Sequence, residues 1–197
     1  MQLRNKPYDF GLVSMLLHWL MAILIIGLFF LGKYIVDLDY YNPWYIKAPE
    51  LHLGLGVIVA LLLAIRMGWR LSNPLPQITG KPWEKYAALW VHRAFYIMIA
   101  GIVISGYFTT TAEGTGLSVF SWFDIPASFY GHPNQEDIAG MVHEWLANLM
   151  IALVVIHSLA ALKHHFINRD STLCRMLVLE ESYSISSTIT KPGNKSL

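Results

Sequence analysis

The chain has 197 residues, of which 55% are hydrophobic and only 14% charged, with a formal net charge of +1. An ordinary soluble domain carries roughly 25% charged residues and arranges its apolar residues in periodic stripes. This chain gathers them into long uncharged runs instead, which excludes an ordinary soluble enzyme and favours an integral membrane protein. Its single cysteine, Cys174, excludes a disulfide framework and cysteine-ligated zinc or iron–sulfur sites.

Four apolar segments are long enough to cross about 30 Å of hydrocarbon as helices. The first begins with 23 uncharged residues, 10–32, which are too many for a signal-peptide core, and no A-x-A cleavage pattern follows them. The apolar runs are continuous and do not alternate, which excludes a membrane barrel. The sequence therefore predicts an all-α transmembrane four-helix bundle, with spans at about residues 11–34, 51–69, 86–111 and 138–164.

Loop charges predict how the bundle is oriented. Lys and Arg predominate before the first span, between the second and third spans, and after the fourth. The loop between the third and fourth spans has no Lys or Arg but carries Glu113, Asp124, Glu136 and Asp137. The positive-inside rule then places both termini in the cytoplasm, on one side of the membrane, as four spans require.

The chain is expected to form one transmembrane domain, residues 1–176, followed by a cytoplasmic tail, residues 177–197. The end of that tail, residues 182–197, is rich in Ser and Thr and contains Pro and Gly. This composition is typical of disorder.

Five of the eight histidines lie within the predicted spans: His18, His52, His92, His143 and His157. One such residue could be a helix–helix hydrogen bond, but ionisable groups inside a membrane are functional candidates. The predicted topology places His52 and His143 on the outer side. On the inner side, His157 is accompanied by either His18 or His92.

The spacing of His143 and His157 indicates a function for these side chains. Fourteen residues are about four helical turns, so both project from nearly one face, about 21 Å apart. Neither inferred pair has the further ligands of a tetrahedral zinc site, whereas two opposed imidazoles complete the ligation of haem iron and favour electron transfer. Without a C-x-x-C-H motif any haem would be held non-covalently. Small residues flank the histidines: Gly54, Gly56, Ala139, Gly140, Ala147, Ala160 and Ala161. They could leave room for two flat macrocycles, or they could simply let the helices pack closely.

Several sequence stretches resemble the bacterial cytochrome b561 family of membrane-embedded dihaem cytochromes. They are LHWL (17–20), ELHLGLG (50–56), VHEWLANL (142–149), and IHSLAALKHHF followed by DSTLCRML (156–177). The resemblance covers residues 8–176. Residues 40–52 and SVFSWFDIPA (118–127) are most similar to the branch called cytochrome b561 homologue 2.

The resemblance implies two haems b, one ligated by His18 with His157 and the other by His52 with His143. His92 then becomes a neighbour of the inner haem, a quinone-side residue or a packing residue. The family's quinone-side histidine corresponds to His164. That residue could equally belong to an ordinary cationic cluster at a helix C-terminus.

The function implied is electron transfer across the bacterial inner membrane, between a periplasmic-side donor and the quinone pool, with ubiquinone the expected substrate. Superoxide is one candidate donor, because the family includes a superoxide oxidase. However, the outer loops are net negative and would not steer an anion. The chain is thus expected to be an oxidoreductase or an electron-transfer cytochrome, partnered by lipid and quinone, and no nucleic-acid partner is expected.

Two alternatives remain open on the residues alone. The chain could be a relay subunit that docks a periplasmic redox protein, and the acidic loop 113–137 favours a basic partner. It could also be a non-redox proton or metal transporter that uses its histidines as ligands. The outer-loop His132 and the inner-side His165 have no assigned role, although His132 could contact a partner or a metal.

Overall fold

The computed structural model describes residues 2–78 and 80–177. It contains four long helices, α1 (Leu12–Val36), α2 (Lys47–Ser72), α3 (Pro82–Thr110) and α4 (Gln135–Phe166), and a short α5 (Cys174–Leu177). Each long helix is apolar and long enough to span a membrane, which confirms the predicted four-helix membrane architecture. The helices extend past most ends of the predicted spans because the spans cover only the apolar part of each helix. The predicted tail lies outside the described residues, except for Leu177.

Large apolar side chains cover the outside of the bundle. The exposed fraction is 67% for Ile23, 64% for Phe30 and 72% for Ile97. A soluble protein rarely leaves so much apolar surface in contact with water, whereas a lipid environment requires it. The chain is therefore a multi-pass membrane protein.

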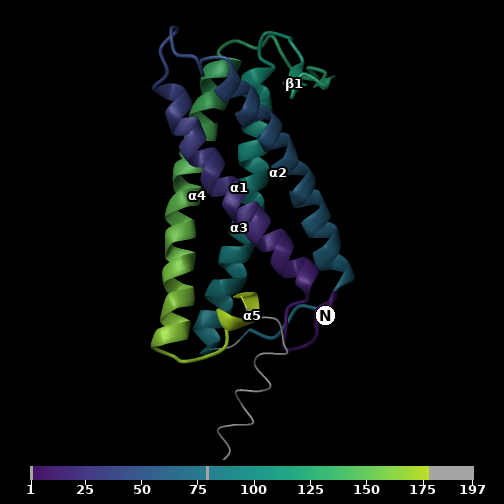
Figure 1. Ribbon diagram of the computed structural model, residues 1–197, viewed down its shortest axis with the longest axis vertical. Helices are drawn as coiled ribbons and strands as arrows, with labels where there is room; N and C mark the ends of the chain where they lie inside the picture. The colour runs from purple at the N-terminus through teal and green to yellow at the C-terminus, as the bar shows by residue number, and fades with distance from the viewer. Residues whose placement is uncertain (1, 79, 178–197) are drawn as a thin grey trace, which may run out of the picture.

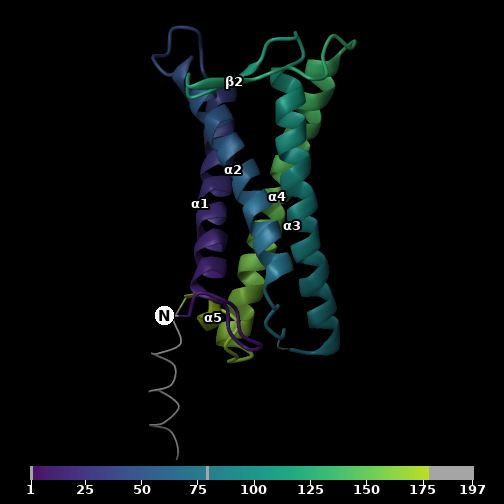
Figure 2. The ribbon, with the colours of Figure 1, turned by 90° about the vertical axis from the view of Figure 1, so that its right-hand side faces the viewer.

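The bundle has two distinct ends, which Figures 1 and 2 show from two sides. The N-terminus and α5 lie at one end, here called the terminal end. The antiparallel strands β1 (Leu117–Val119) and β2 (Phe123–Ile125) lie at the other, the hairpin end. Helix α3 packs along α4, α1 packs along α2, and α2 joins the two pairs through α3. A buried apolar cluster is formed by Met21, Val59, Leu63, Met98, Ile99 and Met150.

The connecting segments are tied together at the terminal end. The Asn5 side chain accepts a hydrogen bond from the backbone N–H of Gly11 at 2.8 Å and donates one to the carbonyl of Pro74 at 3.0 Å. Helix α3 begins at Pro82, which suits the first helical position, and the Glu84 carboxylate accepts the backbone N–H of Lys81 at 2.8 Å. The bond from Asn5 ties the segment that precedes α1 to the segment that follows α2, and the bond between Lys81 and Glu84 caps the start of α3.

Candidate functional site

Two of the predicted histidines face each other near the hairpin end. The ring centroids of His52 on α2 and His143 on α4 lie 6.1 Å apart, with the ring planes at 65°. Both rings line a cavity of about 550 Å³ whose other walls are almost entirely apolar. Its size lies in the usual range for a cofactor or small-molecule site.

The hydrogen on the His143 ring can be placed from its neighbours. Nδ1 lies 2.9 Å from the backbone carbonyl oxygen of Ile102 on α3. A carbonyl can only accept a hydrogen bond, so Nδ1 donates and Nε2 keeps its lone pair. Histidines that bind a metal typically donate their other ring nitrogen in this way.

The His52 ring is also prepared for a ligand. Its Nδ1 atom is buried, and no hydrogen-bond partner reaches it among the described residues. Leaving a buried polar atom unpaired costs about 1–3 kcal/mol, so the position favours a group that would occupy it.

Glycines on neighbouring helices make room for both rings. A Cβ atom at Gly32 would lie 3.2 Å from Cε1 of His52, and one at Gly106 would lie 3.1 Å from the His143 ring. Of the small residues predicted to border a cofactor, Gly56 and Ala147 do line the cavity. Gly54 instead contacts the ring of Phe120 from the hairpin.

Three histidines gather nearer the terminal end. The His157 ring on α4 has its centroid 6.3 Å from that of His18 on α1 and 5.6 Å from that of His92 on α3. Both inner-side partners that the sequence left open therefore lie beside His157. Arg66 on α2 completes the cluster, because its Nη2 atom lies 3.2 Å from Nδ1 of His18. A guanidinium can only donate, so Nδ1 of His18 is an acceptor here and Nε2 carries the hydrogen.

The ring spacings fit a metal ion held between two imidazoles. A metal–nitrogen bond is about 2 Å and a ring nitrogen lies about 1 Å from its centroid, so opposed imidazole ligands have centroids about 6 Å apart. The His52–His143 and His18–His157 pairs have this spacing. The His92–His157 distance is slightly shorter, and spacing alone keeps His92 as a second candidate.

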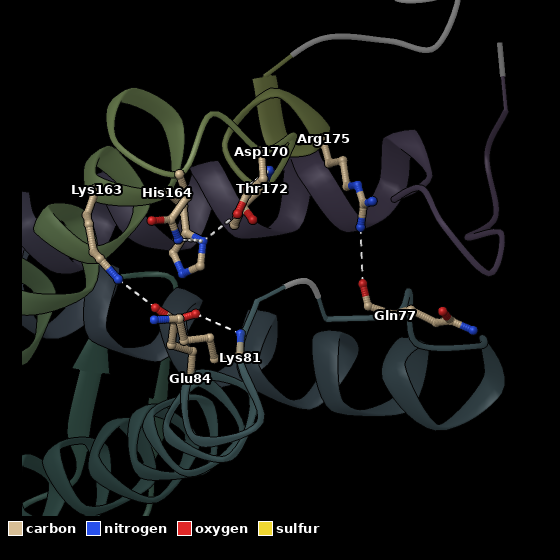
Figure 3. A network of polar contacts seen from close by, with 9 residues as sticks. Gln77, Lys81, Glu84, Lys163, His164, Asp170, Thr172 and Arg175 are labelled. Carbon is tan, nitrogen blue, oxygen red and sulfur yellow. Dashed lines mark hydrogen bonds and ion pairs between the residues drawn. The ribbon is translucent and has the colours of Figure 1, made fainter.

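His164 lies in a polar network at the terminal end, drawn in Figure 3. Its Nδ1 atom is 2.6 Å from a carboxylate oxygen of Asp170, while the neighbouring Lys163 forms an ion pair with Glu84 of α3. Burial raises the pKa of Asp170, but hydrogen bonds from Thr172 and His164 outweigh it and leave that pKa below its ordinary value.

Asp170 and Glu84 were not predicted from the sequence as members of this network. The available signal was the position of Asp170 at the start of DSTLCRML, six residues after His164. The remaining two histidines have local partners. His132 stacks on Phe129 with centroids 4.1 Å apart, and Nδ1 of His165 lies 3.8 Å from Sγ of Cys174.

Comparisons with known proteins agree with the resemblance in the sequence motifs. A family model described as "Prokaryotic cytochrome b561" matches residues 9–178. The chain is 45% identical over 179 residues to cytochrome b561 homolog 2 of Escherichia coli strain K12, covering 90% of this chain and 95% of that protein. It is 31% identical over 137 residues to cytochrome b561 homolog 1 of the same organism, covering 68% and 76% of the two chains. It is 26% identical over 168 residues to a protein of Yersinia pestis named "Probable superoxide oxidase CybB", covering 82% and 91%.

Proposed function

The chain belongs to the prokaryotic cytochrome b561 family, and from that premise we propose that two haems b form an electron path across the membrane. Family membership establishes a bacterial membrane b-type cytochrome that transfers electrons. The proposal adds the ligands, His52 with His143 and His18 with His157, within a dihaem domain of residues 1–176. The observation that carries it is the pair of ring spacings, 6.1 and 6.3 Å, at two levels of one bundle.

The protein's own groups prepare these positions in definite ways. The Ile102 carbonyl holds His143 with its hydrogen on Nδ1, so that Nε2 is available as a ligand. The cavity walls around the hairpin-end pair are almost entirely apolar and offer few polar partners to water. When bound, each haem supplies a one-electron couple whose fully ligated iron favours electron transfer over oxygen binding.

We further propose that the hairpin end faces the periplasm of a bacterial inner membrane and that both termini lie in the cytoplasm. The support is the charge of the connecting segments. Acidic residues without Lys or Arg occupy the segment between α3 and α4, while Arg66, Arg70 and Lys163 lie toward the terminal end.

A donor on the periplasmic side would then pass electrons to ubiquinone at the terminal end, beside His164. The Yersinia pestis relative bears the name of a superoxide oxidase, which makes superoxide one candidate donor. The acidic hairpin end favours a second candidate, a basic redox protein that docks there and uses this chain as a relay. Quinone reduction by the pure protein with superoxide alone would support the first donor. Reduction only with an added protein partner would support the second.

Haem content tests the ligand proposal. We expect the purified protein to show about two low-spin haems b per chain in a reduced-minus-oxidised optical spectrum. His52→Ala should lose one haem and His157→Ala the other, because each substitution removes one of the histidines that would hold that haem. His92→Ala is the matched control at the terminal end and should keep both.

Other outcomes would contradict specific parts of the proposal. If His92→Ala loses haem while His18→Ala keeps it, then His92, and not His18, is the ligand that pairs with His157. A colourless wild-type protein would reject the electron path and favour a histidine-based transporter.

A further inference from the structure

The segment after α4 folds back so that Asp170 reaches His164. The backbone N–H of Asp170 donates to the carbonyl of His164 at 3.1 Å, which brings the two side chains together. Oδ2 of Asp170 lies 2.6 Å from Nδ1 of His164, and Oδ1 accepts the backbone N–H of Thr172 at 2.9 Å. Both carboxylate oxygens are therefore engaged, and each by a different donor (Figure 3).

This geometry decides which nitrogen of His164 carries a hydrogen. The pKa of Asp170 lies below its ordinary value, so its carboxylate is ionised at neutral pH and can only accept. Nδ1 of His164 must then donate. The Asn168 amide nitrogen, 3.2 Å from the same atom, is a contact and cannot be its hydrogen-bond donor.

The other charged groups around His164 are already paired with each other. Lys163 on α4 forms its ion pair with Glu84 on α3, and Glu84 also accepts the backbone N–H of Lys81. Gly80, with a φ of +107°, allows the close approach, since a Cβ there would lie 2.7 Å from Oε2 of Glu84 and 3.2 Å from Cε1 of His164. Neither Glu84 nor Lys163 is bonded to the imidazole in the contacts described, so Asp170 is the ionised partner that orients it.

We propose that Asp170 is a positioning residue that holds His164 with its hydrogen on Nδ1 and directs Nε2 to exchange protons with a bound quinone. The inference rests on the proposed quinone site at the terminal end and adds the residue that orients its histidine. His164 is only 15% exposed and Asp170 22%, so the pair is held in place but still within reach of the terminal surface.

The proton and electron balance of the step is simple. Reduction of one quinone to a quinol takes two electrons, delivered one at a time by the haem path, and two protons, one to each carbonyl oxygen. In its imidazolium form His164 gives the Nε2 proton to one carbonyl oxygen, while the Nδ1 hydrogen stays on the ring and remains hydrogen-bonded to Asp170. His164 then takes up a proton from water at the terminal surface, and the other carbonyl oxygen takes its proton from the same water.

The test is reoxidation of the reduced full-length protein by a short-chain ubiquinone, followed optically at several quinone concentrations. In Asp170→Asn the Thr172 N–H still requires the amide oxygen, so the amide NH₂ group must face His164 and force Nδ1 to accept. We expect the maximal rate to fall about tenfold or more with the half-saturating quinone concentration unchanged, because general acid–base catalysis contributes about 10²- to 10⁴-fold when the acid is correctly held. Asp170→Glu, which keeps a carboxylate, should recover part of the rate.

Asp37→Asn, at the exposed C-cap of α1, is the matched control, since it makes the same substitution far from His164, and it should react like the wild type. Every variant is compared at equal haem content. If Asp170→Asn does not keep its haem, Asp170→Ser is used instead, and the same fall in the maximal rate is expected. A wild-type rate in the variant used would overturn the role of Asp170 while leaving the quinone site in place, provided His164→Ala is slow. A wild-type rate in His164→Ala would instead overturn the quinone site itself.

Discussion

Gly106 on α3 lets the His143 ring occupy its position beside the cavity. A Cβ atom there would come within 3.1 Å of both Cε1 and Nδ1 of His143, closer than most real side-chain contacts. The Nδ1 atom is the one that donates to Ile102. A methyl group at Gly106 would therefore disturb both the orientation of the ring and the bond that fixes its hydrogen.

We expect Gly106→Ala to lower the haem content from about two toward about one per chain, because a displaced His143 ring would be a poor ligand. Loss of the hydrogen bond that orients a metal-binding histidine typically lowers metal affinity by about 10- to 100-fold. Haem quantification on the purified variant checks this. Gly27→Ala on α1 is the control, since a Cβ there meets nothing within 4 Å. It should keep its haem. Full haem content with an unshifted spectrum in Gly106→Ala would contradict the role of this glycine.

Depth along the helices could be predicted from the sequence, but the angular position of each side chain could not. Alternation of spans placed His52 with His143, and their rings do lie together, although their ligand role stays a prediction. Depth alone did not decide whether His18 or His92 lies opposite His157, and both rings lie beside it. Asp170 was missed because its position depends on a turn in which Arg169 takes a φ of +53°, and no apolar pattern signals such a turn.

The hairpin carries backbone strain in its turn. Phe120 and Ser121 form its turn with φ values of +50° and +57°, a backbone region that residues other than glycine rarely adopt. Such residues cost of order 1–3 kcal/mol each and persist only where the surroundings hold them. Here the Phe120 ring packs on Gly54 of α2, and the Ser121 hydroxyl donates to Glu50 at 2.8 Å. The strained turn is thus fixed to the helix that carries His52.

We expect Gly54→Ala to release the hairpin from α2, because the new Cβ would lie 2.5 Å from the Phe120 ring. Proteolysis between residues 119 and 123 should become several-fold faster than in the wild type. The population of locally open states rises roughly tenfold for every 1.4 kcal/mol by which the free energy of opening falls. Gly27→Ala again serves as the control, with an unchanged cleavage rate. Equal cleavage in both variants would show that this contact does not hold the turn.

The long helices could be predicted from the sequence and the short elements could not. An uncharged run of 23 residues has few alternatives to a membrane helix. Strands of three residues, as in β1 and β2, are too short for an alternating pattern to be recognised. Helix α5 has only four residues, too few to form alone, and it is held by tertiary contacts such as the bond from the Trp19 indole to the carbonyl of Met176, 2.8 Å long.

Across the whole molecule, four spans bring the N-terminus and α5 to the same end of the bundle. The single cysteine of the chain, Cys174, begins α5 and is partly exposed. It is therefore a natural reporter for the side on which this end lies.

We expect a membrane-impermeant maleimide to label Cys174 in inverted membrane vesicles but not in intact spheroplasts, because the positive-inside rule places the terminal end in the cytoplasm. A Ser121→Cys substitution combined with Cys174→Ser moves the thiol to the hairpin end and should reverse the result. Labelling of Cys174 in spheroplasts would mean that the proposed orientation is inverted.

The bond from Arg66 to His18 distinguishes the two proposed ligand pairs. His143 already presents a lone pair on Nε2, whereas on His18 that nitrogen carries the hydrogen while Arg66 bonds to Nδ1. Under the proposed ligation His143 would use Nε2 without a change of tautomer, because Ile102 already accepts the Nδ1 hydrogen. Use of Nε2 on His18 would need the hydrogen on Nδ1, where it would face the Arg66 guanidinium. Arg66 therefore disfavours the tautomer of His18 that the proposed ligation needs, whereas Ile102 favours the corresponding tautomer of His143.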